Sequence, residues 1–277
     1  MNLSGKKLLL LGTNMGTLDI IHYARLNKAH VIVADNLPVG NSPGKQASDE
    51  SWMISTTDVD ALEKAAQRNG VDGIFAGVSE LNLRSAMALC HRMGLPFYTT
   101  PEQWKTCSDK PSFKALCRKF DVPVVEEKTY DEHTDESVLS DLNFPLIIKP
   151  ADGSAGRGIS VCHSRTQLLP AIKKALQASL TAKWLAEPYL SGLELTIFYA
   201  VQNGKVFLTG MSDRYTRHGA GGIIPLPAAH IFPSTSLPDY INNLNSRVVS
   251  MFESLKLQNG MIFIQAFKQT NSIVLYE

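Results

Sequence analysis

Short apolar runs alternate with amphipathic stretches through the first part of the chain. Apolar runs typical of buried strands occupy residues 8–11, 30–35, 71–76 and, more briefly, 96–98. Apolar residues with helical spacing follow residue 16 and cover residues 59–68 and 81–93. Because strands that alternate with helices usually pair in parallel, this pattern predicts a Rossmann-like domain built on a parallel sheet.

Farther along the chain, the apolar runs come in pairs joined by turns, which is typical of antiparallel hairpins. The three pairs are residues 144–148 with 159–162, residues 196–201 with 205–209, and residues 260–267 with 272–277. Helical spacing covers residues 112–120, 165–180 and 237–257. The middle pair flanks Gln202-Asn203-Gly204, which is a strong turn signal. This half of the chain therefore predicts antiparallel sheets packed against helices.

A chain of 277 residues is long for one compact core and suggests two domains. We predict a Rossmann-like α/β domain over residues 1–108 and an α+β domain over residues 109–277. Within the second domain, residues 109–185 contain a linker and the first hairpin with its long loop. Residues 186–277 contain the other two hairpins.

Composition and charge narrow the function. Hydrophobic residues make up 44% of the chain and charged residues 19%, as in ordinary soluble proteins, and the net charge of +1 gives no electrostatic case for nucleic acid or an anionic membrane. No apolar run approaches the length of a membrane span, and the four cysteines lack the paired spacing of metal ligands. We expect a cytoplasmic protein that binds neither nucleic acid nor membrane. Its oligomeric state is open, with a homodimer as one option.

The first hairpin has an unusual connection. Lys149 ends its first apolar run, and glycines at 153, 156 and 158 lie in the loop that follows. Glycines let successive backbone N–H groups approach one phosphate, and Lys149 adds a positive charge beside them. A solvent-exposed hairpin loop could carry the same glycines for turn geometry alone. The common phosphate loops run from a strand into a helix, whereas this one continues as a strand at Ile159.

Together with two later segments, this hairpin resembles the ATP-grasp superfamily, in which such a loop closes over a triphosphate. The segment 184–197 resembles the hinge of that superfamily, where one glutamate begins a backbone stretch along adenine and a second glutamate, seven residues on, binds the ribose. A carboxylate suits a ribose because it can accept a hydrogen bond from each hydroxyl. The order and spacing of the motifs come nearest to the carbamoyl phosphate synthetase large-subunit-like branch of the carboxylate-amine ligases.

The resemblance implies a set of ATP-binding positions along the linker, the loop and the hinge. These residues are Lys110, Lys149, Gly153, Ser154, Ala155, Gly156, Arg157, Gly158, Glu187, Tyr189, Leu190 and Glu194. Taken singly, a lysine at a helix start or a glutamate beside a turn would be an ordinary surface residue.

The resemblance also implies a magnesium site on the last hairpin, with Gln265 and Glu277 as ligands. Their hard oxygen atoms suit Mg²⁺, which also binds phosphate oxygens and water. In the superfamily an asparagine and an arginine follow the second ligand, whereas this chain stops at Glu277. We therefore expect the chain to be truncated just after this glutamate, and turnover to need the rest of a longer enzyme.

A polar run over residues 212–222 contains two arginines, a histidine and glycines. An arginine fork binds carboxylate or phosphate well, and in the superfamily this region lies near the phosphate and the acceptor. Lys149, Arg214 and His218 are thus the candidate catalytic residues, with His218 a weaker candidate for a general base. A surface loop explains the same run equally well.

Residues 77–80 form a polar turn after a predicted strand, where open α/β sheets often place ligands. Ser79 and Glu80 are also suitable caps for the helix that follows. We favour capping, while the similarity of this acidic turn to carbamoyl phosphate synthetases keeps a substrate role open.

The function implied by the resemblance is that of an ATP-dependent ligase. Such an enzyme activates a small carboxylate as an acyl phosphate, for attack by an amine or similar nucleophile, and uses ATP and Mg²⁺. One alternative is a protein that binds ATP without catalysis. A less favoured alternative is a nicotinamide-dependent oxidoreductase that uses Gly12, Gly16 and Asp35, although these glycines lack the Gly-x-Gly spacing of the dinucleotide fingerprint.

Overall fold

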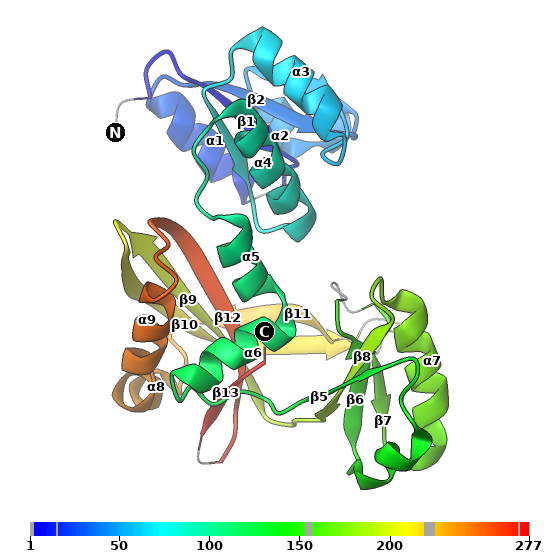
Figure 1. Cartoon of the computed structure of the whole chain (residues 1–277). Coiled ribbons are helices and arrows are strands. Elements are labelled where there is room, and N and C mark those ends of the chain that lie inside the picture. The colour runs from blue at the N-terminus through cyan, green and yellow to red at the C-terminus, as the bar shows by residue number, and fades with distance from the viewer. Residues whose placement is uncertain (1–2, 15, 153–156, 219–224, 271, 277) are drawn as a thin grey trace. The chain divides into compact units, whose positions relative to one another are not determined.

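The computed structural model describes residues 3–14, 16–152, 157–218, 225–270 and 272–276 (Figure 1). The chain divides into two compact units, Met1–Pro101 and Glu102–Glu277. Helix α5 (Pro101–Ser108) begins at this division. Our predicted boundary after residue 108 lies at the other end of the same helix.

The first unit contains the predicted parallel sheet, with strands in the order β3-β2-β1-β4. Its strands are β1 (Lys7–Leu11), β2 (His30–Asp35), β3 (Glu50–Met53) and β4 (Gly73–Ala76), and all three pairings are parallel. The predicted strand over residues 96–98 is wrong, because this segment has no strand pairing. Its apolar residues pack instead: the rings of Phe97 and Tyr98 stack 4.1 Å apart, and the Tyr98 hydroxyl donates to the Ala76 carbonyl.

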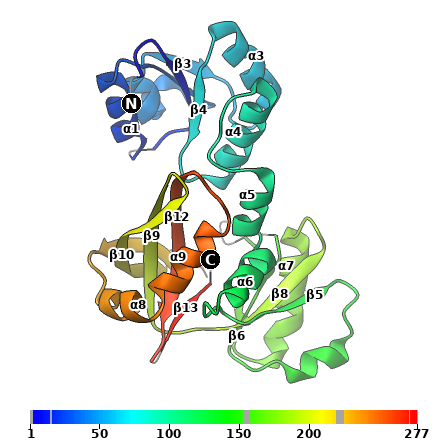
Figure 2. The ribbon, with the colours of Figure 1, turned by 60° about the vertical axis from the view of Figure 1, so that its left-hand side comes forward.

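Helices cover both faces of the parallel sheet. Helix α1 (Thr17–Leu26) packs on one face through Ile21 and Ala24. On the other face lie α3 (Val59–Asn69) and α4 (Glu80–Met93), which run side by side (Figure 2). Two short elements, the 3₁₀ turn η1 (Val39–Asn41) and α2 (Pro43–Ala47), follow β2. Because both faces are covered, the central strands β1 and β2 are buried apolar runs without alternation, whereas the edge strand β3 is partly polar.

The second unit holds two antiparallel sheets, as the paired apolar runs predict. One sheet has the order β5-β8-β6-β7. Its strands are β5 (Lys128–Asp131), β6 (Leu146–Pro150), β7 (Ser160–Cys162) and β8 (Lys183–Pro188). Helix α7 (Leu168–Ala178) covers one face of this sheet (Figure 1). The other elements around it are the 3₁₀ turns η2 (Glu136–Asp141) and η3 (Arg165–Gln167).

The larger antiparallel sheet has the order β11-β10-β9-β12-β13. Its strands are β9 (Leu193–Gln202), β10 (Lys205–His218), β11 (Pro225–Ile231), β12 (Asn259–Lys268) and β13 (Ile273–Leu275). Helices α6 (Lys110–Lys119), α8 (Leu237–Asn243) and α9 (Asn245–Glu253) contribute to the core on one face of this sheet. Asn203 and Gly204, both with positive φ, make the predicted turn between β9 and β10.

The predicted single helix over residues 237–257 is two helices, α8 and α9, separated at Leu244. The break lies beside a buried polar group, the Tyr199 hydroxyl. This hydroxyl donates to Asn245 at 2.8 Å and also contacts the Tyr240 hydroxyl. The spacing of apolar residues alone does not predict these hydrogen bonds. In the part of the chain that the structure describes, no helix combines the length and apolar character needed to cross a bilayer.

Candidate functional site

Two oppositely charged side chains lie on neighbouring strands of the smaller antiparallel sheet. Lys149 is on β6 and Glu187 is on β8, where Ile147 pairs with Glu187. Side chains two residues apart on a strand share a face, so Lys149 and Glu187 lie on the same side of the sheet. Lys149 Nζ is 2.6 Å from Glu187 Oε2, and the two side chains are only 8% and 4% exposed. Both residues are among the predicted ATP-binding positions.

Helix α6 brings a second lysine to the same glutamate. Lys114 Nζ donates to the other oxygen of Glu187 and, at 2.6 Å, to Glu127 Oε2, and its side chain is fully buried. Lys114, Glu127, Lys149 and Glu187 form what we call the lysine–glutamate cluster. With two lysines and two glutamates, its formal charge is zero. A buried cluster of this kind is stable only because each charge is paired.

The pKa shifts within this cluster have opposite origins. Burial lowers the pKa of Lys149, the positive charges of Lys114 and Lys110 lower it further, and Glu187 opposes them without cancelling them. Burial alone would raise the pKa of Glu187, but the charges and hydrogen bonds of Lys149 and Lys114 outweigh it and hold that pKa below its ordinary value. Glu187 is therefore an ionised carboxylate. Lys149 is a desolvated ammonium whose charged form an added anion would stabilise.

Lys110 begins α6, the helix that also carries Lys114. The carboxylate of Asp109 caps this helix by accepting from the Ser112 backbone N–H at 3.0 Å. Lys110 and Lys114 are four residues apart on α6 and so share one side of the helix, and the charge of Lys110 is among those that lower the pKa of Lys149. Two predicted phosphate ligands, from helix α6 and strand β6, thus converge on one region of the second unit.

A second polar cluster lies on the larger sheet. Glu194 on β9 pairs in register with Arg214 on β10, and the two side chains form an ion pair. The Tyr276 hydroxyl donates to Gln265 Oε1 at 2.6 Å and lies 3.3 Å from Glu194 Oε2. We call Glu194, Arg214, Gln265 and Tyr276 the Glu194 cluster. It joins three residues to which the sequence assigned separate roles: ribose ligand, catalytic arginine and metal ligand.

The Glu194 cluster offers hard oxygen donors to a metal ion, from the Glu194 carboxylate and the Gln265 amide. These atoms suit Mg²⁺ chemically. Within the described residues, no group of three or more histidines, cysteines, aspartates or glutamates is arranged to hold a metal. The second predicted ligand, Glu277, lies outside the described residues.

The remaining predicted positions are only partly described. Residues 153–156 of the loop, and with them Gly153, Ser154, Ala155 and Gly156, lie outside the described residues. Arg157 is exposed, and Gly158 has φ +76° with Pro150 and Ala178 so close that a Cβ would lie 2.7 Å from Ala178 Cβ. A glycine is therefore required at this end of the loop.

The hinge positions follow the end of β8. The Tyr189 backbone N–H donates to the Pro145 carbonyl at 3.0 Å, so this stretch continues beside β6. The Tyr189 side chain is 42% exposed, with its ring 6.3 Å from that of His163, and Leu190 is half-buried. His218 ends β10 with its backbone paired to Pro225, and its side chain is outside what the structure describes.

The first unit contains a buried ion pair where a nicotinamide enzyme would hold a ribose. Asp35 accepts hydrogen bonds from the Leu37 N–H at 2.8 Å and from the Ser42 hydroxyl at 2.7 Å, and it pairs with Lys45 at 2.9 Å. We call Asp35, Ser42 and Lys45 the Asp35 cluster. Because its carboxylate is already fully engaged within the chain, Asp35 gives no support to a nicotinamide site.

The loop after β1 is filled in a similar way. At Gly12, with φ +65°, an added Cβ would lie 2.5 Å from the Asn82 amide nitrogen, and at Gly44 it would lie 2.0 Å from the Thr13 side chain. The glycines of this region therefore allow close packing within the chain. Asn82 Nδ2 also donates to the Leu11 carbonyl and fixes the start of α4. Ser79 occupies the N-cap position of α4 and Glu80 lies in its first turn, as predicted, but the Ser79 side chain makes no capping hydrogen bond.

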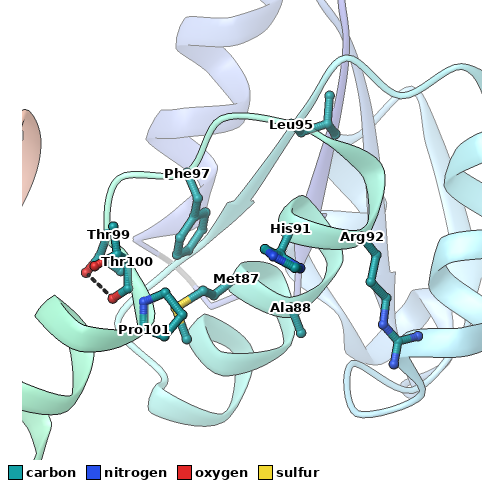
Figure 3. A pocket seen from close by; sticks show the side chains of 9 residues that line it. All are labelled: Met87, Ala88, His91, Arg92, Leu95, Phe97, Thr99, Thr100 and Pro101. Atoms are coloured by element: carbon teal, nitrogen blue, oxygen red, sulfur yellow. Dashed lines mark hydrogen bonds between the residues drawn. The ribbon is translucent and has the colours of Figure 1, made fainter.

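A pocket of about 530 Å³ lies in the first unit, between α4 and the segment that follows it (Figure 3). It is lined by Met87, Ala88, His91, Arg92, Leu95, Phe97, Thr99, Thr100 and Pro101. The lining carries no carboxylate, and Arg92 is held by ion pairs to Asp60 and Glu63. None of the predicted ATP-binding residues lines this pocket.

Sequence reasoning missed Lys114, Glu127 and Tyr276. The one signal for Lys114 was its place on the inward side of α6, next to Phe113 and three residues before Cys117, where a lysine needs a buried partner. No sequence signal marked Tyr276 beyond its position immediately before Glu277. These side chains come together through the packing of strands and helices, and no local sequence motif predicts that packing.

Comparisons with known proteins agree with this architecture. Residues 109–218 match the family model described as the carbamoyl-phosphate synthase L chain, ATP binding domain. One similar solved structure is the dimeric biotin carboxylase domain of Hydrogenobacter thermophilus 2-oxoglutarate carboxylase with MgADP, ADP and bicarbonate. Its TM-score is 0.83 at 19% identity, over 98% of this chain and 62% of that chain.

Two further structures show the same likeness. Campylobacter jejuni biotin carboxylase has a TM-score of 0.80 at 17% identity, over 98% of this chain and 64% of that chain. Staphylococcus aureus N5-carboxyaminoimidazole synthetase, complexed with ADP, has a TM-score of 0.78 at 18% identity, over 100% of this chain and 71% of that chain. This chain thus spans only part of each solved chain. At these identities the likeness establishes the fold, and it confirms the predicted parallel sheet followed by antiparallel sheets.

Proposed function

We propose that this chain is an ATP-dependent carboxylate-amine ligase of the ATP-grasp superfamily, because residues 109–218 match an ATP-binding domain and the fold is similar to that of biotin carboxylases. In this reaction the γ-phosphoryl group of ATP passes to a substrate carboxylate, which becomes an acyl phosphate while ADP is formed. An amine or similar nucleophile then attacks the acyl carbon and displaces phosphate. The substrates are small molecules.

One observation carries the proposal. Lys149 is a buried ammonium with three N–H donors, and among the described residues its side chain bonds only to Glu187. Lys110, a second cation within electrostatic range, begins the neighbouring helix. Two converging positive charges beside a glycine-rich hairpin loop suit a polyphosphate, whose charges would stabilise the ammonium form of Lys149.

The other residues take roles that follow from their chemistry. Residues 153–158 cover the phosphates with their backbone N–H groups, Glu187, Tyr189 and Leu190 run along the adenine, and Glu194 accepts from the ribose hydroxyls. For Glu194 to do so, Arg214 has to give up part of its present ion pair. Arg214 is then available to the transferring phosphoryl group or the acceptor.

In phosphoryl transfer the protein itself forms few covalent bonds. The proposed catalysis therefore consists of positioning the reacting groups and stabilising the charge that develops on them. Lys149 and Arg214 stabilise the charge that develops on the phosphoryl group, and His218 is the proposed proton acceptor. Bound Mg²⁺ would supply further charge neutralisation, with Gln265 and Glu277 as its protein ligands. A cytoplasmic location and a homodimer complete the proposal, the latter supported by the dimeric biotin carboxylase domain.

Calorimetric titration with ATP tests the proposal. We expect Lys149→Ala to weaken ATP binding by about 1.5 to 3 kcal/mol, the range for hydrogen bonds to charged groups. The matched control is Lys183→Ala, an exposed lysine on strand β8 of the same sheet, which should leave the affinity unchanged.

Equal ATP affinities of wild type and Lys149→Ala, with both proteins folded, would remove the basis of the proposal. Formation of ADP with pairs of carboxylates and amines separates a ligase from a protein that binds ATP without catalysis. Titration with NADH tests the less favoured oxidoreductase.

A further inference from the structure

Lys114 stands apart from the other lysines of the candidate site, because it is fully buried and both of its partners are carboxylates. It lies on the inward side of α6, where it cannot reach solvent. Glu187 in turn is held from two sides, with Lys114 on one oxygen and Lys149 on the other. One carboxylate thus connects a buried lysine to the lysine proposed to bind phosphate.

This arrangement has a consequence when an anion arrives. A polyphosphate attracts Lys149, and the hydrogen bond from Lys149 to Glu187 weakens as the ammonium turns toward the phosphate oxygens. A buried carboxylate that loses its only partner is strongly destabilised. Glu187 keeps a partner, because Lys114 remains bonded to its other oxygen.

The charge balance points in the same direction. Lys114, Glu127, Lys149 and Glu187 together are neutral, so phosphates approach a site without excess negative charge. Without Lys114, the two carboxylates would face one lysine, and the cluster would repel phosphate and hold Lys149 more tightly. In a poorly hydrated site such a charge acts over several ångströms.

We propose that Lys114 is a positioning residue of the nucleotide site: it holds Glu187 and balances the buried carboxylates, so that Lys149 can bind the polyphosphate. The inference rests on the proposed function, since it assumes that Lys149 binds phosphate. Lys114 itself touches no ligand. Its effect on binding should therefore depend on the number of phosphate groups in the ligand.

A purely structural role makes a different prediction. If Lys114 only anchored α6 to β8, its loss would loosen the hinge and weaken the binding of every adenine nucleotide to the same extent. Restoring the charge balance elsewhere in the cluster would not repair that damage. Comparison of ATP with AMP, and of a single with a double variant, separates the two roles.

The experiment uses calorimetric titration of the full chain with ATP and AMP. Lys114→Met keeps the length of the side chain and gives the cluster a net charge of −1, and we expect at least about tenfold weaker ATP binding and a smaller loss for AMP. Lys114→Met with Glu127→Gln is neutral again and should recover the part of the ATP affinity that depends on charge balance, while Glu187 still lacks Lys114 and the rest of the loss remains. Equal losses for ATP and AMP, or no recovery in the double variant, would overturn the inference.

Glu127→Gln alone covers the case in which Lys114→Met does not fold, which thermal unfolding would reveal. This variant keeps both lysines on Glu187 and gives the cluster a net charge of +1, so ATP should bind more tightly by a factor of a few. Unchanged or weaker binding would contradict the inference. If the wild type binds ATP but all variants match it, only this inference fails, whereas a wild type that binds no adenine nucleotide removes the proposed function as well.

Discussion

The two units each bury a lysine against a carboxylate, and the two arrangements differ in how many hydrogen bonds the lysine makes. Lys45 in the first unit donates to the carbonyls of Asp35 and Leu37 at 2.9 and 2.7 Å and pairs with the Asp35 carboxylate at 2.9 Å. Its three N–H donors are therefore all engaged. Lys149 in the second unit bonds only to Glu187 among the described residues.

This difference indicates that burial by itself does not identify a functional lysine. Both ammonium groups are largely removed from solvent, with side-chain exposures of 1% for Lys45 and 8% for Lys149. The Asp35 cluster ties the segment after β2 to the carboxyl end of that strand, and its lysine has no donor left for a ligand. The lysine–glutamate cluster keeps donors on Lys149 and holds its carboxylate with a second lysine, as a binding site requires.

The largest effect is expected when Lys45 is removed. Lys45→Met leaves the buried Asp35 without its cation, and breaking a buried ion pair in this way costs about 3 to 5 kcal/mol. Hydrogen exchange of the amides in β1 and β2 should report this loss of local stability in the first unit. Lys6→Met, which breaks a more exposed pair with Asp72, is the control and should change these amides far less.

A smaller effect is expected from Lys149→Met. Glu187 keeps Lys114 as a partner in this variant, so the second unit should lose only about 1.5 to 3 kcal/mol, the usual contribution of one hydrogen bond to a charged group. Hydrogen exchange of β6 and β8 measures it, together with loss of ATP binding. A destabilisation as large as that of Lys45→Met would show that Lys149 is structural too, and the contrast between the two lysines would disappear.

The smallest effect concerns pH. Burial acts to raise the pKa of Asp35, but the hydrogen bonds from Ser42, Lys45 and Leu37 outweigh it and hold the pKa below its ordinary value. A depressed pKa stabilises the fold above the pKa of the unfolded chain, about 4, and this contribution is lost as pH falls through the folded value. The stability difference between wild type and Asp35→Asn should therefore shrink on acidification. A difference that does not vary with pH would contradict this account.

Much of the fold could be predicted from the sequence, because its elements carry strong local patterns. The apolar run of β1, the amphipathic spacing of α3 and the Asn203-Gly204 turn each appeared in the structure where the pattern placed them. Elements with weak patterns were missed or misjudged. Strand β3 is short and partly polar. The break between α8 and α9 lies where Asn245 accepts a hydrogen bond from the buried Tyr199 hydroxyl.

The candidate site shows the same division between residues marked by local patterns and residues placed by long-range packing. The sequence by itself pointed to Lys149, the glycine-rich loop and the two hinge glutamates, because strand, loop and turn signals are local and their order resembles one superfamily. The packing of distant segments brought Lys114, with its partner Glu127, to Glu187. It also brought Arg214 and Tyr276 to Glu194, with Gln265 bonded to Tyr276. Charge pairing inside a protein depends on distances between segments far apart in the chain, and those distances are decided by how helices and strands pack.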